Sequence, residues 1–281
     1  MKRVFIMVGL ILMKEMKFMR THCFAEVNGT LIYYETIGEG DALVLIHSGY
    51  TDLRLWDDQF ELFGKYFKVI RYDIRGFGRS NKPSKPFSHF EDLKELLNHL
   101  GINKAHLVGV SMGGSIAIDF TLQYPDSVEY LVLSGSSLNG YLYANDEASS
   151  QRNLAGMSIV KRDENFNQSI EFMLNNPMWR QSNLKTRQRL KNMFMETSLE
   201  WVLDDLVQIA KPHASERLFQ IRKRTLLIIG TEDSLPIIEI ASVLESGITS
   251  AKKVTVNGTG HLPNLDKPEE FNKIVLDFLL N

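Results

Sequence analysis

Continuous apolar runs alternate with amphipathic stretches along most of this chain. Runs such as Ala42–Ile46 are apolar at every position, which is typical of strands that are covered on both faces in a parallel sheet. The alternation predicts an α/β fold, a mostly parallel central sheet with helices on both faces. The further expected strands are Lys68–Tyr72, Ala105–Gly109, Tyr130–Leu133, Thr225–Ile229 and Lys253–Val256, and the expected helices are Trp56–Phe63, Phe90–Leu100, Met112–Tyr124 and Pro268–Leu280.

The start of the regular pattern is a hairpin signal. Phe24–Thr36 consists of two extended stretches around Asn28 and Gly29, and an Asn-Gly pair in this position is the strongest short signal for a β-hairpin. Residues 1–20 lie before this pattern. They contain the apolar run Val4–Met13 without a small-residue cleavage site after it, so we interpret them as an extension outside the fold; an export signal or anchor is the alternative.

The strand–helix rhythm stops between residues 139 and 215. This stretch has no Val/Ile-rich strand but carries Met, Leu, Phe and Trp at helical spacing. We therefore expect a helical cap inserted into an α/β core made of residues 21–138 and 216–281. Ligands of open α/β sheets bind at the carboxyl edge of the strands, so such a cap would help to shape a substrate pocket. Packing within the cap is the alternative role for its large side chains.

Composition narrows the function classes. The chain has 281 residues, is 44% hydrophobic and carries a net charge of −2, so neither a nucleic-acid partner nor an anionic membrane surface is expected. No apolar run reaches the length of a membrane-spanning helix. Cys23 is the single cysteine, which excludes an intrachain disulfide and favours a cytoplasmic location, with export or anchoring through the N-terminal run as the minor alternative. Neither metal-ligand spacing nor a dinucleotide or P-loop fingerprint is present, so we expect no metal and no cofactor.

The sharpest chemical signal is Gly109-Val-Ser-Met-Gly-Gly114, between an apolar strand and a helical stretch. This is the context that a nucleophile elbow requires. A strand that turns at once into a helix forces the central residue, Ser111, into a strained backbone, and only small side chains fit on either side. The turn exposes the Ser111 hydroxyl at a helix N-terminus, where backbone amides favour negative charge. A tight turn with a capping serine is the structural alternative.

From Phe24 to the C-terminus the chain resembles the α/β-hydrolase superfamily, and it is most similar to the enol-lactonases, esterases and cofactor-free haloperoxidases. The resemblance rests on the elbow and on three further segments, which are Leu45-Ile-His-Ser-Gly49, Thr51-Asp-Leu-Arg-Leu-Trp56 and Asp73-Ile-Arg-Gly-Phe-Gly-Arg-Ser80. It implies a serine hydrolase with a catalytic triad. It also implies that His47, Asp73 and Arg75 brace loops near the site.

The triad order in this fold is serine, acid, histidine. His213 and His261 are the histidines after the elbow; His261 follows the last strand, where the superfamily keeps its base, and His213 lies in the insertion. Imidazole suits a base because its pKa lies near neutrality. The family's Gly-x-x-Asp segment after the penultimate strand selects Asp233 as the acid, with the neighbouring Glu232 as its rival.

The resemblance also implies an oxyanion hole. One donor is the backbone N–H of Met112, and the second is that of Gly49, with Tyr50 as the alternative. Ser48 stands where the family usually has glycine. Met178, Trp179 and Tyr50 are candidates to line the substrate pocket, as are Met173, Phe194 and Trp201.

These residues predict two-step acyl transfer on a small carboxylic ester or lactone. A C–C bond hydrolase or a perhydrolase-type haloperoxidase of the same fold is the first alternative. A non-catalytic ligand receptor with an intact triad is the second. Haloalkane dehalogenases and epoxide hydrolases of this fold carry aspartate at the elbow, so the serine disfavours both.

Overall fold

The computed structural model describes residues 20–142, 147–176, 178–179 and 181–281. The apolar run near the N-terminus, with the expected extension up to residue 19, lies outside the described residues. Residues 143–146, part of the expected insertion, also lie outside the described residues.

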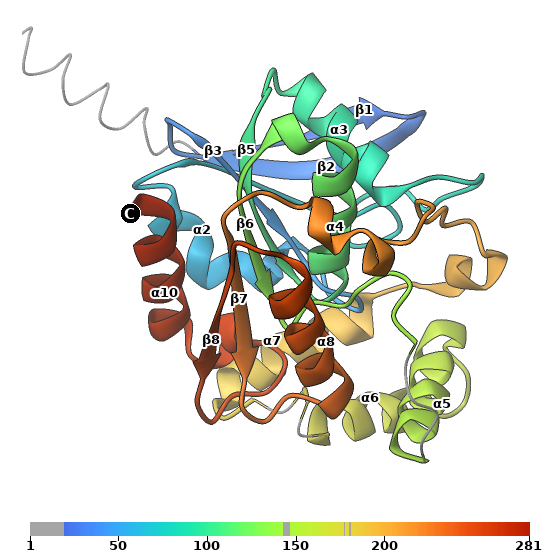
Figure 1. Ribbon diagram of the computed structural model, residues 1–281. Coiled ribbons are helices and arrows are strands. Elements are labelled where there is room, and N and C mark those ends of the chain that lie inside the picture. Colours follow the sequence, from blue (N-terminus) through green and yellow to red (C-terminus); the bar gives the residue numbers. More distant parts are fainter. Residues whose placement is uncertain (1–19, 143–146, 177, 180) are drawn as a thin grey trace, which may run out of the picture.

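A single eight-stranded sheet forms the centre of the protein (Figure 1). The strand order is β1-β2-β4-β3-β5-β6-β7-β8, and all neighbours from β4 to β8 are parallel, whereas β2 runs antiparallel to both β1 and β4. The predicted mostly parallel sheet is confirmed. The strands are β1 Thr21–Val27, β2 Thr30–Ile37, β3 Ala42–Ile46, β4 Lys68–Tyr72, β5 Ala105–Val110, β6 Val128–Ser134, β7 Thr225–Gly230 and β8 Ala251–Val256.

The strands have the burial that their sequences predict. Every residue of β3, β5 and β7 is buried, as expected for apolar strands covered on both faces. The hairpin between β1 and β2 turns at Asn28 and Gly29, which both have positive φ, 48° and 70°. Two consecutive positive φ angles define the type I′ turn that an Asn-Gly pair favours.

Helices cover both faces of the sheet (Figure 1). One face carries α3 His89–His99, α4 Met112–Gln123 and α8 Leu235–Gly247, and the other carries α2 Asp57–Phe63, α9 Pro263–Asp266 and α10 Pro268–Leu280. We did not predict α8 from the sequence. Its signals are present, because Ser234 precedes it, Pro236 stands in its first turn, and Ile237, Ile240 and Leu244 recur at helical spacing on its buried side.

Between β6 and β7 the chain forms three helices, α5 Glu147–Lys161, α6 Phe166–Asn175 and α7 Leu184–Glu196. Figure 1 shows them together beyond one edge of the sheet. A backbone hydrogen bond from His261 N to Met178 O (2.8 Å) joins the segment between α6 and α7 to the loop after β8, which places this segment at the carboxyl edge. Within the described residues, no helix has the length and apolar character needed to span a membrane.

Candidate active site

The elbow residues Gly109–Gly114 form a sharp turn between β5 and α4. Ser111 has φ 54° and ψ −117°, a strained conformation for a residue with a side chain. A Cβ atom added at Gly109 would lie 2.3 Å from the carbonyl oxygen of Gly113, and one at Gly113 would lie 2.3 Å from that of Ile46. Both contacts are with backbone, so no side chain can fit there. The glycines of the motif are therefore required by packing.

His261 and Asp233 form a buried pair. His261 Nδ1 lies 3.1 Å and 3.0 Å from the two carboxylate oxygens of Asp233, and the two side chains have no solvent exposure. Because a carboxylate only accepts hydrogen bonds, the Nδ1 atom carries the proton in this pair. The pairing leaves Nε2 as the ring nitrogen that can accept a proton.

Ser111 belongs to the same neighbourhood as this pair. Its amide donates to Ser134 O at the end of β6 (3.0 Å), and the next residue, Gly135, lies so close to the pair that an added Cβ would be 3.0 Å from His261 Nδ1 and 3.2 Å from Asp233 Oδ2. The His261 Nε2 atom is buried without a hydrogen-bond partner among the described residues. The Ser111–His261 hydrogen bond is therefore absent from this conformation; in unliganded enzymes such bonds are often long and tighten only with substrate.

The loop after β3 is braced by His47. Its Nδ1–H donates to Ser48 O (2.8 Å) and its Nε2 accepts from the amide of Ile74 (2.9 Å). Complete burial lowers the pKa of His47 to about 4, so the ring is neutral, as these two bonds require. The Ser48 hydroxyl donates to Gly49 O (3.1 Å) and lies 3.3 Å from the Thr51 hydroxyl. Serine at position 48 is thus accommodated by its own hydrogen bonds.

The candidate oxyanion donors lie on two elements. Met112 is the first residue of α4, where an amide has no acceptor within the helix. On the loop after β3, Gly49 borders open space, since a Cβ there would meet no atom within 4 Å. The next residue, Tyr50, has φ 61°. A positive φ in two non-glycine residues, Ser111 and Tyr50, is the kind of strain that clusters at functional sites.

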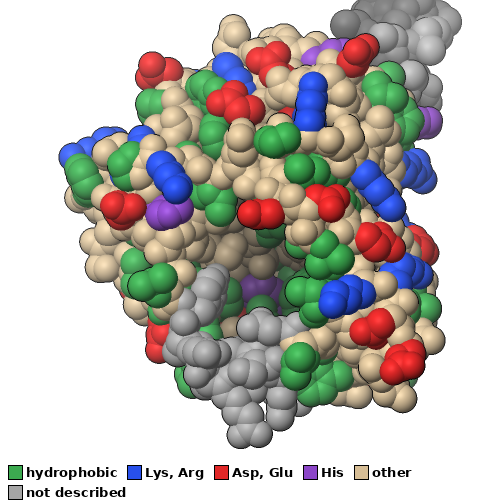
Figure 2. Space-filling view, turned by 90° about the vertical axis from the view of Figure 1, so that its right-hand side faces the viewer, with side chains coloured by type: hydrophobic (Ala, Val, Ile, Leu, Met, Phe, Trp, Pro, Cys, Tyr) green, Lys and Arg blue, Asp and Glu red, His purple; other side chains and the backbone are tan. Residues whose placement is uncertain are grey.

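An aromatic cluster lies over His261. The Trp179 ring packs edge-on against the imidazole, with ring centres 5.0 Å apart, and against Phe194 at 5.4 Å. Tyr50 contacts both aromatic rings at 6.5 Å and 5.7 Å. Trp179 thus lies beside the candidate base and Tyr50 packs behind it on Trp179 and Phe194. Met178 contributes the carbonyl that accepts from the His261 amide; this last role was not foreseen. Figure 2 shows a hollow on the side of the molecule that carries α5 in Figure 1, with hydrophobic side chains along its border.

Four other residues that the sequence singles out are Asp73, Arg75, His213 and Glu232. Asp73 accepts from the amides of Leu53 and Arg79, both at 2.8 Å, and Arg75 is paired with Asp92 at 2.6 Å and 2.7 Å. Both therefore hold loops together. The remaining two candidates lie apart from the His261–Asp233 hydrogen bonds: His213 packs against Gly140, and Glu232 is exposed.

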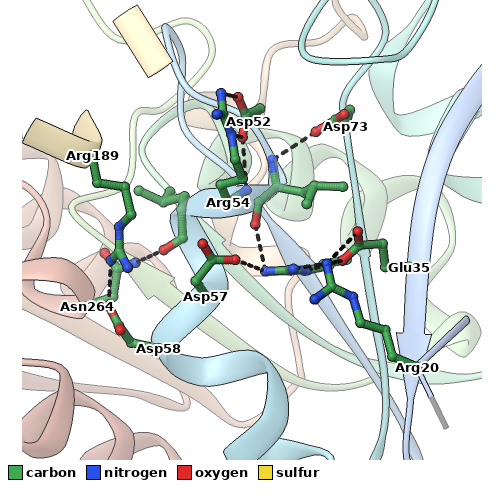
Figure 3. Close-up of polar contacts among 12 residues, drawn as sticks. Arg20, Glu35, Asp52, Arg54, Asp57, Asp58, Asp73, Arg189 and Asn264 are labelled. Atoms are coloured by element: carbon green, nitrogen blue, oxygen red, sulfur yellow. Dashed lines mark hydrogen bonds and ion pairs between the residues drawn. The ribbon is translucent and has the colours of Figure 1, made fainter. Parts of the chain in front are cut away.

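A cavity of about 510 Å³ is lined in part by residues of β2 and β4, and most of its lining side chains are charged or polar. We call it the polar cavity. Glu35 lines it and accepts hydrogen bonds from Arg71 and from Arg20, the latter labelled beside it in Figure 3. Arg71 also donates to Asp57 (2.6 Å) and stacks over the Phe60 ring at 4.2 Å. In the part of the chain that the structure places, no cluster of three or more His, Cys, Asp or Glu side chains could hold a metal.

Comparison with known proteins shows the family of the chain. A family model described as alpha/beta hydrolase fold matches residues 41–268. A 2-hydroxy-6-oxo-6-phenylhexa-2,4-dienoate hydrolase from Comamonas testosteroni is 27% identical over 90% of this chain and 93% of its own length. A 2-hydroxy-6-oxononadienedioate/2-hydroxy-6-oxononatrienedioate hydrolase from Paraburkholderia phymatum is 30% identical over 88% of this chain and 90% of its own. The crystal structure of the enol-lactonase from Burkholderia xenovorans superposes with a TM-score of 0.78 at 25% identity, covering 92% of this chain and all of that one (100%).

Proposed function

Because the chain belongs to the α/β-hydrolase family, we propose that it is a serine hydrolase that cleaves small carboxylic esters or lactones, with Ser111, His261 and Asp233 as its triad. One observation carries this proposal. A serine in a strained turn at a helix N-terminus shares the carboxyl edge of the sheet with a fully buried His–Asp pair, and within the described part of the chain the second ring nitrogen has no partner. A buried nitrogen without a partner destabilises the fold, so its retention supports a role in catalysis.

The first half-reaction uses each group in turn. The Ser111 hydroxyl rotates toward His261, loses its proton to Nε2 and attacks the carbonyl carbon. The negative oxygen that forms is held by the amides of Met112 and Gly49, with Tyr50 as the alternative second donor. Asp233 stabilises the imidazolium through Nδ1–H. His261 then returns the proton to the departing alkoxide, which leaves an acyl group on Ser111.

The second half-reaction releases the acyl group. A water molecule gives its proton to His261 Nε2 and attacks the acyl carbon. The tetrahedral intermediate collapses, the proton returns from His261 to the Ser111 oxygen, and the carboxylic acid leaves. The helices α5–α7 would act as a cap over this site, since the segment that carries Met178 and Trp179 contacts His261.

A second candidate function is hydrolysis of a C–C bond next to a ketone. It is favoured by the relatives from Comamonas and Paraburkholderia, whose named substrates contain a ketone and no ester. The same groups would serve both reactions. The two candidates differ in the leaving group, which is a carbon fragment in one case and an alkoxide in the other.

Substitution of the nucleophile tests the shared mechanism. Ser111→Ala should abolish hydrolysis of p-nitrophenyl acetate and labelling by a fluorophosphonate, whereas Ser242→Ala, an exposed serine on α8, should leave both unchanged. Turnover by the alanine variant at more than about one per cent of the original rate would overturn the assignment, because triad removal costs far more.

A comparison of kcat/KM then separates the two functions. The panel contains p-nitrophenyl esters of increasing chain length, lactones of increasing ring size and a 2-hydroxy-6-oxo-dienoate. The ester or lactone function requires the highest kcat/KM on a member of the first two groups. A clear preference for the dienoate would replace it with the C–C hydrolase function.

A further inference from the structure

A second cavity, of about 300 Å³, lies beside the elbow between the first turns of α3 and α4 and residues 201–209. We call it the side cavity. Met112, the residue after the candidate nucleophile, lines it, so the side cavity adjoins the place where the reacting carbonyl would lie. Its volume is at the lower end of the range for small-molecule sites.

The wall formed by residues 201–209 is held in place. The Phe87 amide donates to Leu206 O (3.0 Å), and the Phe87 carbonyl accepts from Gln208 N (2.7 Å). The Trp201 indole donates to Gly76 O (3.0 Å) and packs against Phe77, ring centres 5.8 Å apart. The walls of the side cavity are therefore fixed by interactions within the chain.

Three titratable groups line the side cavity. Asp119, on α4, is 4% exposed, and its Oδ2 accepts from the Asn139 amide (2.6 Å). His89 lines the cavity, and its Nδ1 atom is buried and has no partner among the residues placed by the structure. Asp205 lies at the exposed end of the lining. Among the residues that the structure places, neither lysine nor arginine lines this cavity.

The electrostatics of the lining are therefore one-sided. Burial raises the pKa of Asp119 to about 6, so this carboxyl is still mostly ionised at pH 7.5. Burial lowers the pKa of His89 to about 3, helped by the nearby Arg75, and the ring is neutral. Arg75 is itself neutralised by Asp92. A buried carboxylate with a neutral hydrogen-bond partner favours a cation at its free oxygen, and the rings of Phe77, Phe90 and Trp201 add faces that attract cations.

We propose that the side cavity is a specificity subsite for a substrate group that carries an ammonium on an apolar body, and that it disfavours carboxylates. As a substrate subsite it rests on the proposed function. As a binding site it does not. The proposal separates this chain from the relatives named above, since their named substrates are carboxylates.

Binding to the Ser111→Ala protein tests the site without turnover. Isothermal titration at pH 7.5 with benzylamine, benzyl alcohol and benzoate compares one ring with three end groups. Benzylamine should bind at least about tenfold more tightly than benzyl alcohol, because a hydrogen bond to a charged group contributes more than a neutral one. Benzoate should bind more weakly than benzyl alcohol. Equal affinities, or a preference for benzoate, would overturn the proposal.

Substitution of the buried acid locates the effect. Asp119→Asn should remove the preference for benzylamine over benzyl alcohol, whereas Asp126→Asn, an exposed aspartate outside the side cavity, should keep it. If the preference persists in Asp119→Asn, the ammonium binds elsewhere and the proposal fails.

A pH series gives the same information without altering the cavity. Benzylamine remains protonated between pH 5 and 8, so its affinity should fall about tenfold from pH 8 to pH 5 as Asp119 takes up a proton near pH 6. The other charged or titratable groups around Asp119 are His89, Asp205, His213 and Arg217. To remove the contribution of His213, the series is repeated with His213→Gln, and the fall should persist. An affinity independent of pH in this variant would contradict the proposal.

Kinetics connect the side cavity to catalysis. Acetate esters of 4-(aminomethyl)benzyl alcohol and 4-carboxybenzyl alcohol should differ in KM. The KM of the ammonium ester should be at least about tenfold lower than that of the carboxylate ester. If benzylamine binds as expected but no ester is hydrolysed, the proposed function fails and the binding site stands. If both esters are hydrolysed with equal KM, the serine hydrolase stands and the subsite fails.

Discussion

The polar cavity and the candidate active site both bury charged groups, but they differ in how these groups are satisfied. In the polar cavity each buried carboxylate has at least two donors: Glu35 accepts from two arginines, Asp52 from the backbone and side chain of Arg54, and Asp73 from two amides. At the candidate active site, His261 Nε2 is buried with no hydrogen-bond partner among the residues that the structure describes.

This difference is more informative than cavity size or charge. The polar cavity, of about 510 Å³, is lined mostly by charged and polar side chains, yet its buried carboxylates are occupied by interactions within the chain. Such a network stabilises loops. A free buried nitrogen next to a strained serine is available for chemistry. The predictions below therefore separate loss of activity from loss of stability.

The largest expected effect is on catalysis. Asp233→Asn should lower kcat on p-nitrophenyl acetate by about 10⁴-fold, because an amide can donate to the ring and so favour the wrong tautomer. The melting temperature, measured by circular dichroism, serves to show that the variant is folded. Glu232→Gln is the matched control and should retain kcat. A loss of less than about tenfold in Asp233→Asn would show that another group orients His261.

The next effect is on stability. Arg71→Met should lower the free energy of unfolding by about 3–5 kcal/mol, because it leaves buried Glu35 without its buried partner. Urea unfolding measures this loss, and kcat of the folded fraction should change little. Lys273→Met is the control, since the side chains of Lys273 and its partner Asp277 are 77% and 60% exposed and such a pair contributes about 1 kcal/mol or less. Equal losses in the two variants would show that burial is not the deciding factor.

The smallest effect lies between the two regions. His47→Ala should lower kcat by about 10²-fold through displacement of the loop that carries Gly49. Because the pKa of His47 is about 4, the ring is neutral above pH 6, and the ratio of the rates of variant and original protein should be constant from pH 6 to 9. His99→Ala, at an exposed position on α3, should have no effect. A ratio that changes with pH would mean that His47 titrates during turnover.

Local sequence patterns predicted most of the fold. The buried strands were visible as apolar runs, and the hairpin was visible in Asn28-Gly29. Helix α8 was missed because its sequence, rich in Ile and Leu, follows directly on the Asp233 loop and shows little contrast between its faces. The antiparallel pairing of β2 with β4 depends on contacts between distant segments, which no local pattern encodes.

The candidate site was predictable to the same extent. Ser111, Asp233 and His261 carry local motifs, and the structure brings the last two into direct contact. The Tyr50–Trp179–Phe194 cluster and the side cavity join residues from separate elements. Their formation depends on tertiary pairing, such as that of Phe87 with Val207, so neither could be derived from spacing along the chain.

The hydrogen bond from the His261 amide to the Met178 carbonyl joins the candidate base to the segment between α6 and α7. A single neutral hydrogen bond contributes about 1 kcal/mol, so a bulky substrate that displaces this segment would break it easily. Such a substrate would also allow the His261 imidazole to move out of line with Ser111. An oversized ester should thus occupy the enzyme as an inhibitor rather than be consumed, and size exclusion would act through misalignment of the base as well as through closed access.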